Sequence, residues 1–525
     1  MHDLLHDPLI GIRTRAGPTR VNIPDLFGRL ASGEIEDYTG LRAHQADPWH
    51  VFLVQIAASI LARHPETREI PEDPAFWRTG LLELAKGCAN AWELLVEDVT
   101  KSAFLQHPLA DSEDLKRHFK PKALTPDELD ILVTAKNHDL KRMRARADDP
   151  EAWIFALLCC QTTSGYFGKG NYGVVRMNSG NGSRPVVAMV QEVMPSARFR
   201  EEINAVSQMR RKALGGKFGF RLNGVVLTWL TSWARDGHQH MIQDLDPWFV
   251  EAARPLRLVP IFDGIVALGS TTAARQIGPK TLENGDVGDP WTPINVADKK
   301  KGRSALTVAA DGWTADRISA LLFEQGFELT DLQRPRADMN GDAWFVGSVL
   351  VGGQGETEGF HRFAIPVPAK VRAGLLAATE KKALGKLSEE LLSDAKEAGR
   401  ALKSALISMA QGGPEMVNFD RKATVAWCDQ VIADWSLQWR DGFFPALWRI
   451  ASEDRSTVLA DWRTQLVALA RTALRAAEYR IPLPSARRYR SVVKAEGMLN
   501  GALRKKGLLQ ERERPLVNPE QENVA

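Results

Sequence analysis

Histidine, cysteine, lysine and acidic side chains are the groups in this sequence that could do catalysis, but none has the spacing of a catalytic motif. The eleven histidines are scattered, without the His-Glu-x-x-His pattern that binds zinc. Gly216-Lys217 resembles the end of a phosphate-binding P-loop, except that Phe218 stands where that loop needs Ser or Thr. The chain also lacks the paired acids of a metal-dependent nuclease. We therefore expect a binding protein that is not an enzyme.

The segment 162–185 is the strongest candidate for contact with a partner. Six glycines lie between 165 and 182, against 41 in the whole chain, and glycine lets the backbone approach a narrow partner closely. Lys169, Arg176 and Arg184 add positive charge, and aromatic rings and Asn amides lie between them. Such groups contact nucleic-acid backbones and grooves. A surface loop with tight turns is the alternative interpretation.

Two further patterns in glycine-rich or charged sequence are weaker signals. The letters from Gly168 to Gly173 match G-x-G-x-x-G, but no acid about 20 residues downstream ends a second strand, as a dinucleotide site requires. The run 135–146 holds five cations and one acid. This pattern is typical of a solvated helix face, and the alternative is a basic loop that engages phosphates.

Composition limits the class of protein. A chain of 525 residues predicts two or three domains. The formal net charge of +3 is small, so nucleic-acid binding would depend on local patches. Four cysteines without a Cys-x-x-Cys pair indicate a reducing compartment. The first residues do not resemble a signal peptide and no apolar run is long enough to span a membrane, so we expect a cytoplasmic protein.

The sequence pattern predicts an α+β fold in two domains. A large mixed domain, 1–367, would contain short strands (8–13 and 19–23), helices (47–62, 76–95, 150–161 and 198–213) and a strand-rich stretch, 255–365. The last of these includes a Gly-Asp-Pro-Trp turn at 288–291 and a hairpin with a glycine-rich tip at 352–359. A four-helix-type bundle, 368–510, would follow, with helices at 369–411, 420–438, 442–451, 455–478 and 485–507. Residues 511–525 are expected to be a disordered tail.

The order of these pieces resembles the CasA family, the large subunit of the type I-E CRISPR surveillance complex called Cascade. The resemblance covers nearly the whole chain: the opening strands, the early helices, Lys136-Asn137-His138-Asp139, the glycine segment, the turn at 288–291, the hairpin and the bundle. It implies a ribonucleoprotein subunit that recognises the protospacer-adjacent motif (PAM) in duplex DNA, promotes strand opening and R-loop formation, and recruits a helicase-nuclease. Its partners would be guide RNA, the backbone and small subunits of Cascade, and the target duplex.

The resemblance also assigns roles to residues. Motif reading from the minor groove falls on Gly168, Lys169, Gly170 and Asn171, with either Arg275 or Lys280 in addition. A strand-separating wedge would be Gly353, Gln354, Gly355 and Glu356. A further nucleic-acid contact loop would include Lys136, Asn137, His138 and Lys141. The expected phosphate contacts on the bundle are Arg487, Arg488, Arg490, Lys494, Arg504, Lys505 and Lys506.

Some CasA proteins carry a cysteine-rich zinc element, but this chain has no cysteine between 161 and 427. We therefore expect no metal and no cofactor. Two alternatives from other classes remain open: a nucleic-acid-modifying enzyme whose catalytic residues are not evident from spacing, and a helical scaffold protein.

Overall fold

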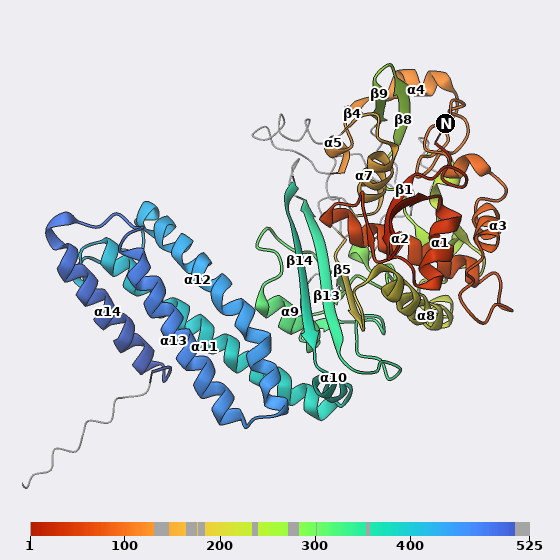
Figure 1. Ribbon diagram of the computed structural model, residues 1–525. Coiled ribbons are helices and arrows are strands. Elements are labelled where there is room, and N and C mark those ends of the chain that lie inside the picture. Colours follow the sequence, from red (N-terminus) through yellow and green to blue (C-terminus); the bar gives the residue numbers. More distant parts are fainter. Residues whose placement is uncertain are drawn as a thin grey trace, which may run out of the picture. The chain divides into compact units, whose positions relative to one another are not determined.

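The computed structural model describes residues 2–130, 146–163, 176, 184–233, 240–270, 283–300, 302–352 and 357–509. The chain divides into two compact units, Met1–Arg372 and Ala373–Ala525 (Figure 1). The first unit mixes helices and strands and the second is helical, so the α+β class predicted from the sequence is confirmed. The expected boundary at 367/368 lies five residues before this division. The expected tail, 511–525, is outside the described residues.

The helices of the first unit begin and end where the sequence provides caps. In α1 (Ile23–Ser32), the Asn22 side chain accepts from the amide of Asp25, and Gly33 closes the helix with a φ of 85°. In α7 (Pro150–Thr162), Asp149 is the cap and Pro150 occupies the first turn, where no amide donor is lost. The other helices are α2 (Ala43–Leu61), α3 (Pro74–Leu84), α4 (Ser112–His118), α5 (Asp127–Asp130), α8 (Pro195–Leu214) and α9 (Ala315–Leu322).

Small sheets accompany these helices. A three-stranded antiparallel sheet is formed by β5 (Val186–Val190), β13 (Ala343–Gly352) and β14 (Thr357–Val367), with β13 in the centre (Figure 1). Two further antiparallel sheets join β1 (Ile10–Thr14) to β2 (Gly17–Val21) and β3 (Asp37–Tyr38), and β9 (Gly264–Gly269) to β4 (Lys120–Ala123) and β8 (Leu256–Ile261). The remaining strands are β6 (Val225–Leu227), parallel to β7 (Leu245–Val250), and β10 (Ile294–Asn295), β11 (Ser304–Ala305) and β12 (Phe327–Glu328).

The core of the first unit is centred on α2, which is buried on most of its circumference. Trp49 stacks on Phe52 at 5.6 Å and meets the edge of Phe155 from α7 at 5.0 Å. Burial of aromatic side chains of this size supplies much of the hydrophobic stabilisation of a domain. Helices α2 and α7 are therefore fixed against one another, which matters for the segments that leave their ends.

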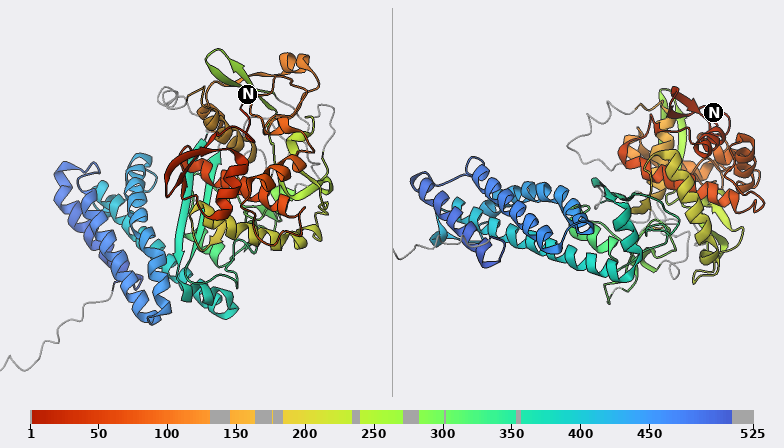
Figure 2. Two further views of the ribbon diagram at one scale, coloured as in Figure 1. Left: turned by 45° about the vertical axis from the view of Figure 1, so that its right-hand side comes forward. Right: turned by 60° about the horizontal axis from the view of Figure 1, so that its bottom comes forward.

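The second unit is a bundle of four long helices among the described residues: α11 (Ala378–Ala410), α12 (Lys422–Trp448), α13 (Arg455–Ala477) and α14 (Arg488–Lys505), preceded by the short α10 (Ala369–Leu376). The four run side by side in every view (Figures 1 and 2). The sequence predicted a break at 438–442, but α12 continues through Pro445. Packing of Trp439 and Phe443 against Trp462 holds the helix through this point, with ring centroids 6.1 and 6.0 Å away. Among the described residues, no helix is long and apolar enough to cross a membrane.

Candidate nucleic-acid interface

Four of the five residue groups expected to contact nucleic acid lie outside the described residues. These are Lys136, Asn137, His138 and Lys141; Gly168, Lys169, Gly170 and Asn171; Arg275 and Lys280; and Gly353, Gln354, Gly355 and Glu356. The described residues on either side of them show where each segment leaves the fold and where it returns. The site can therefore be built from these flanking residues, which are called the roots of the segments below.

Helix α7 connects the first two segments, because 131–145 precedes it and 164–175 follows it. At its start, the buried Glu151 accepts a hydrogen bond from the amide of Gly11 at 2.6 Å and pairs with Arg20 at 3.2 Å. Burial raises the pKa of Glu151, and these contacts oppose the rise. The carboxylate thus ties the beginning of α7 to β1 and fixes one root of the predicted interface.

The end of α7 lies beside the root of the third segment, 271–282. The buried Gln161 side chain donates to the carbonyl of Arg254 at 3.1 Å and accepts from its amide at 2.6 Å. One residue further on, the Pro255 carbonyl accepts from the amide of Ser270, the last described residue before 271. The glycine segment and the 271–282 segment therefore leave the fold close to one another.

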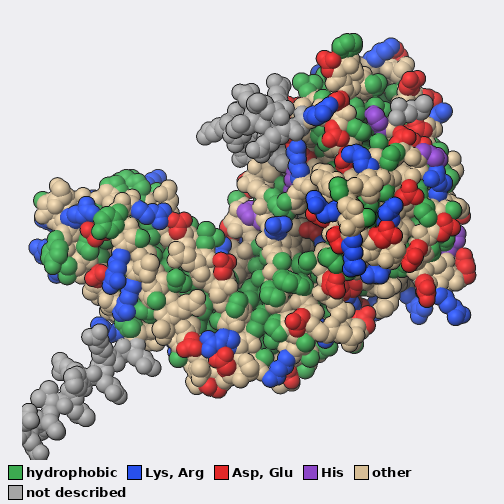
Figure 3. Space-filling model, viewed as in Figure 1, with side chains coloured by type: hydrophobic (Ala, Val, Ile, Leu, Met, Phe, Trp, Pro, Cys, Tyr) green, Lys and Arg blue, Asp and Glu red, His purple; other side chains and the backbone are tan. Residues whose placement is uncertain are grey.

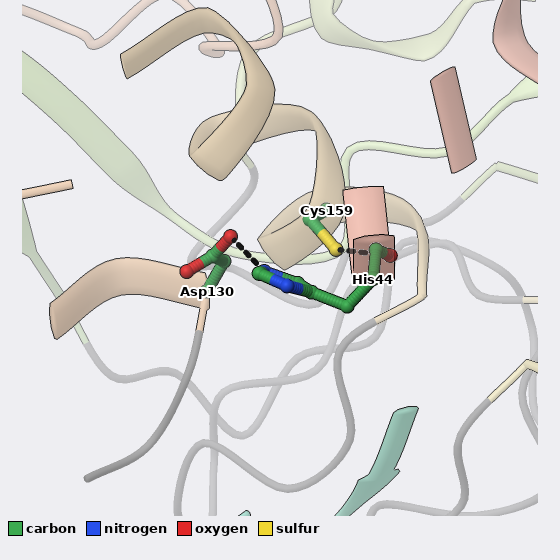
Figure 4. A group of neighbouring side chains, drawn as sticks. All are labelled: His44, Asp130 and Cys159. Carbon is green, nitrogen blue, oxygen red and sulfur yellow. Dashed lines mark hydrogen bonds and ion pairs between the residues drawn. The ribbon is translucent and has the colours of Figure 1, made fainter. Parts of the chain in front are cut away.

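A buried cluster of His44, Asp130 and Cys159 joins two of these roots (Figure 4). His44 Nε2 lies 2.7 Å from Asp130 Oδ2, and the Cys159 thiol donates to the His44 carbonyl at 3.8 Å. Asp130 immediately precedes 131–145, and Cys159 lies 3.4 Å from the hydroxyl of Thr163, which immediately precedes 164–175. The His44 ring is also 6.3 Å from that of Phe360 on β14, four residues after the hairpin tip.

The cluster has the residue types of a nucleophilic cysteine site, but its geometry does not activate the thiol. The hydrogen bonds of Cys159 go to a carbonyl and a hydroxyl rather than to the imidazole of His44. Burial, with the Asp130 carboxylate nearby, raises the pKa of Cys159 well above its usual range. Because the thiolate is the reactive form, the unliganded thiol of Cys159 is not activated as a nucleophile.

The return of the glycine segment is held by a buried group of two guanidiniums and two carboxylates. Arg184 makes a bidentate pair with Asp289, at 2.7 and 2.9 Å, and lies 3.2 Å from Glu251. Arg176 lies 3.4 Å from Glu251, and its guanidinium stands 3.8 Å over the ring of Phe249. Asp289 belongs to the Gly-Asp-Pro-Trp turn, which therefore anchors the glycine segment.

This arrangement corrects the sequence analysis, which counted Arg176 and Arg184 as charges for a nucleic acid. Both are buried, at 0% and 2% exposure, so neither reaches a phosphate. Burial disfavours ionisation of all four groups, but the two guanidiniums outweigh it for Asp289 and lower its pKa. For Glu251 burial prevails and the pKa is raised. Both carboxylates are far in the sequence from the arginines with which they pair, so no local sequence pattern could reveal the pairing.

The same return point lies alongside the hairpin. β5 begins at Val186, which pairs with Ser348 on β13, and the pairing runs antiparallel to Val190 opposite Trp344. From Ser348 to Gly352 the strand rises roughly 14 Å, at about 3.4 Å per residue. The chain thus returns from the glycine segment toward the end of the sheet at which β13 leads into the hairpin tip.

The basic residues on the second unit are described, and all seven are exposed. Four of them pair with acids on the bundle: Arg488 with Glu478 at 3.2 Å, Arg490 and Lys494 with Glu415 at 3.5 and 3.9 Å, and Lys506 with Glu397 at 3.0 Å. Arg487, Arg504 and Lys505 have no ion-pair partner among the described residues. In Figure 3 cations (blue) lie among hydrophobic and uncharged side chains on the visible face of the bundle. Exposed pairs of this kind are weak, so a phosphate can replace the acid at low cost.

Sequence reasoning did not identify His44, Asp130, Cys159 or Gln161 as parts of the site. These residues come from three helices that are far apart in the sequence, so no spacing rule connects them. The one available signal was the position of Asp130 and Cys159 beside the two basic and glycine-rich segments.

A mixed unit with a β-hairpin, followed by a helical bundle, is also the fold of solved CRISPR-associated proteins. In particular, the chain has the fold of Cse1, also called CasA. It superimposes on Cse1 of Acidimicrobium ferrooxidans with a TM-score of 0.63 and 14% identity, over 96% of this chain and 98% of that one. For CasA of Thermus thermophilus the TM-score is 0.62 and the identity 16%, over 96% and 99%.

A chain of a solved CRISPR RNA-guided surveillance complex is also similar, with a TM-score of 0.54 and 16% identity over 95% of this chain and 99% of that one. No protein-family model matches the sequence, and no curated protein matches it. The resemblance to CasA expected from the order of the sequence motifs is therefore confirmed at the level of the fold.

Proposed function

We propose that this chain is the large subunit of a type I-E CRISPR surveillance complex. In this role it reads the protospacer-adjacent motif in duplex DNA, promotes strand opening and recruits the helicase-nuclease, without cleaving DNA itself. The observation that carries the proposal is the full-length agreement with the Cse1 fold, in which the chain covers 98% or more of the solved proteins. Guide RNA would read the sequence by base pairing, and the protein only the short motif.

The convergence of the roots supports this proposal. The segments that hold Lys169 and Asn171, Arg275 and Lys280, and Lys136 and Lys141 leave the first unit close together. A motif of a few base pairs needs contacts from several segments at one place. Glycine backbone can also reach the floor of a minor groove only about 6 Å wide, where larger side chains do not fit.

The first test uses the assembled complex with guide RNA. Lys169→Ala combined with Asn171→Ala is expected to weaken binding to a matched target duplex by about tenfold or more, which corresponds to about 1.4 kcal/mol. Lys116→Ala is the control, because Lys116 is an exposed cation on α4 that pairs with Glu113. Mobility shifts measure binding and gel filtration measures assembly. Equal binding by the double variant and the wild type, with assembly intact, would reject the assignment.

The second test separates strand opening from duplex capture. Replacement of Gln354 and Glu356 by Gly is expected to reduce permanganate reactivity of target thymines more than it reduces duplex binding. Normal reactivity in the variant would refute the wedge. Incubation of the purified chain with duplex DNA and divalent metal tests the rival class, since cleavage or base modification would identify an enzyme.

A further inference from the structure

The cluster of His44, Asp130 and Cys159 brings three metal-ligand donors together from three separate helices. One donor atom from each residue lies within 4.8 Å of the other two, and all three side chains are buried (Figure 4). We propose that these residues bind one divalent metal ion of the zinc class. The proposal goes beyond the proposed function and does not depend on it.

The carboxylate of Asp130 provides an independent observation that points to a ligand. Its Oδ2 lies 2.7 Å from His44 Nε2 and accepts from Gln45 Nε2 at 2.7 Å. Its Oδ1 is buried and has no hydrogen-bond partner among the residues that the structure describes. A buried charged oxygen without a partner is costly, and nearly all such atoms in native proteins are satisfied. A bound cation would satisfy it only after the carboxylate turns, because Oδ1 lies on the side away from His44 in Figure 4.

The donor set selects the type of ion. A thiolate ligand favours zinc over magnesium and calcium, which prefer oxygen donors. A neutral imidazole, a carboxylate and a thiolate together cancel the charge of a divalent ion, so the loaded site adds no net charge to the interior. Three protein ligands leave the fourth position of a tetrahedral ion open to water.

The site requires the donor atoms to shift. With metal–ligand bonds of about 2.0 to 2.3 Å, neighbouring ligand atoms of a tetrahedral ion lie roughly 3.2 to 3.8 Å apart. The contact between His44 and Asp130 would therefore open by about half an ångström, and donors near the 4.8 Å limit would close by about 1 Å. Gln45 remains hydrogen-bonded to the carboxylate, as outer partners of metal ligands commonly are. The bound ion would fasten α2, α5 and α7 together.

The test measures metal in the full-length chain after removal of any affinity tag. Elemental analysis after gel filtration is expected to give about one zinc per wild-type chain. Cys159→Ala is expected to lose it, whereas Cys160→Ala keeps it. Cys160 is the matched control because it is the adjacent, equally buried cysteine of the same helix and is not part of the cluster. Cobalt in place of zinc is expected to give thiolate charge-transfer absorption that only Cys159→Ala abolishes.

Thermal unfolding keeps the test decisive if Cys159→Ala fails to fold. In that case Asp130→Asn, which retains the size of the side chain, is expected to lose the metal. The melting temperature of the wild type should fall when a chelator removes the metal, whereas that of Asp130→Asn should not change. The proposal is overturned if the wild-type chain neither retains nor takes up zinc. It is equally overturned if the Cys159 and Cys160 variants hold the same amount.

Discussion

Replacing Arg184 by Met should destabilise the first unit in a way that depends on pH. In the native protein two guanidiniums face two carboxylates in a buried site, so the group is electrically balanced. Arg184→Met leaves Arg176 to balance both Glu251 and Asp289. Removal of one partner from a buried pair costs about 3 to 5 kcal/mol, because it leaves an uncompensated buried charge. We expect a loss of this size in the free energy of unfolding at pH 8.

The dependence on pH follows from the remaining carboxylates. In the variant, one of them takes up a proton, because burial already raises the pKa of Glu251 and half of the opposing positive charge is gone. Its pKa is then higher in the folded than in the unfolded state. The folded protein binds more protons between these two values, so the free energy of unfolding falls as pH rises, by at most about 1.4 kcal/mol per pH unit. The defect should be smaller at pH 5.5 than at pH 8.

Urea unfolding followed by tryptophan fluorescence measures the effect, since Trp291 lies next to the Arg184 guanidinium at 5.9 Å. Arg490→Met is the control. It also removes an arginine from a carboxylate, but the Arg490–Glu415 pair is exposed, so its loss is expected to change the free energy of unfolding much less. Equal losses in the two variants, or a defect in Arg184→Met that grows toward low pH, would refute the reasoning.

Three further predictions test other parts of the structure. Replacing three exposed cations on the bundle, Arg487, Arg488 and Arg490, by Glu should reduce the slope of log affinity against log salt. The expected reduction is about 0.9 for each phosphate that the bundle no longer neutralises. Titration of the complex with target DNA at several salt concentrations measures this slope. Glu202→Gln should lower the free energy of unfolding by about 3 kcal/mol or more at pH 7, because it breaks the pairing with Arg198 and weakens the hydrogen bond from Trp291 Nε1 at 2.6 Å. The Arg198 guanidinium overcomes burial and lowers the pKa of Glu202. The difference from wild type in urea unfolding should therefore shrink as pH falls below about 4.5. Gly80→Ala should destabilise the packing of α3 on α2 by about 1 to 3 kcal/mol in the same assay, since a Cβ there would lie 2.3 Å from Ile60 Cγ2.

Much of the fold could be predicted from the sequence, because its signals are local. The helices of the bundle were placed within a few residues of their observed bounds, with two exceptions: the break expected at 438–442 is absent, and the single helix expected at 369–411 is divided into α10 and α11. The hairpin of β13 and β14 and the helix α7 were predicted from alternation, glycine and caps. The start of α2 was placed four residues late, because Asp47-Pro48 looks like a helix start although both lie inside the helix. Pro48 lies beyond the first turn of α2, so it cannot donate to the His44 carbonyl, which accepts from the Cys159 thiol instead.

The roles of the charged residues could not be predicted in the same way. Lys169, Arg176 and Arg184 have the same appearance in sequence, yet two of the three are buried structural residues. What decides the matter is the position of Glu251 and Asp289, which only the tertiary fold brings to them. A count of cations in a glycine-rich segment therefore overestimates the charge available to a nucleic acid.

The buried arginines support the proposed function although they are not exposed to a nucleic acid. A segment that reads DNA through its backbone gains affinity when its ends are already fixed, because less conformational entropy is lost on binding. Here the return of the glycine segment is fixed by Arg184 and Asp289, and its departure by Gln161 and Cys159. Surface cations at these ends would attract any duplex by charge alone, whereas a neutral, buried anchor leaves recognition to the few groups on the segment itself. Selectivity for a short motif is better served by the second arrangement, since attraction to phosphates carries no sequence information.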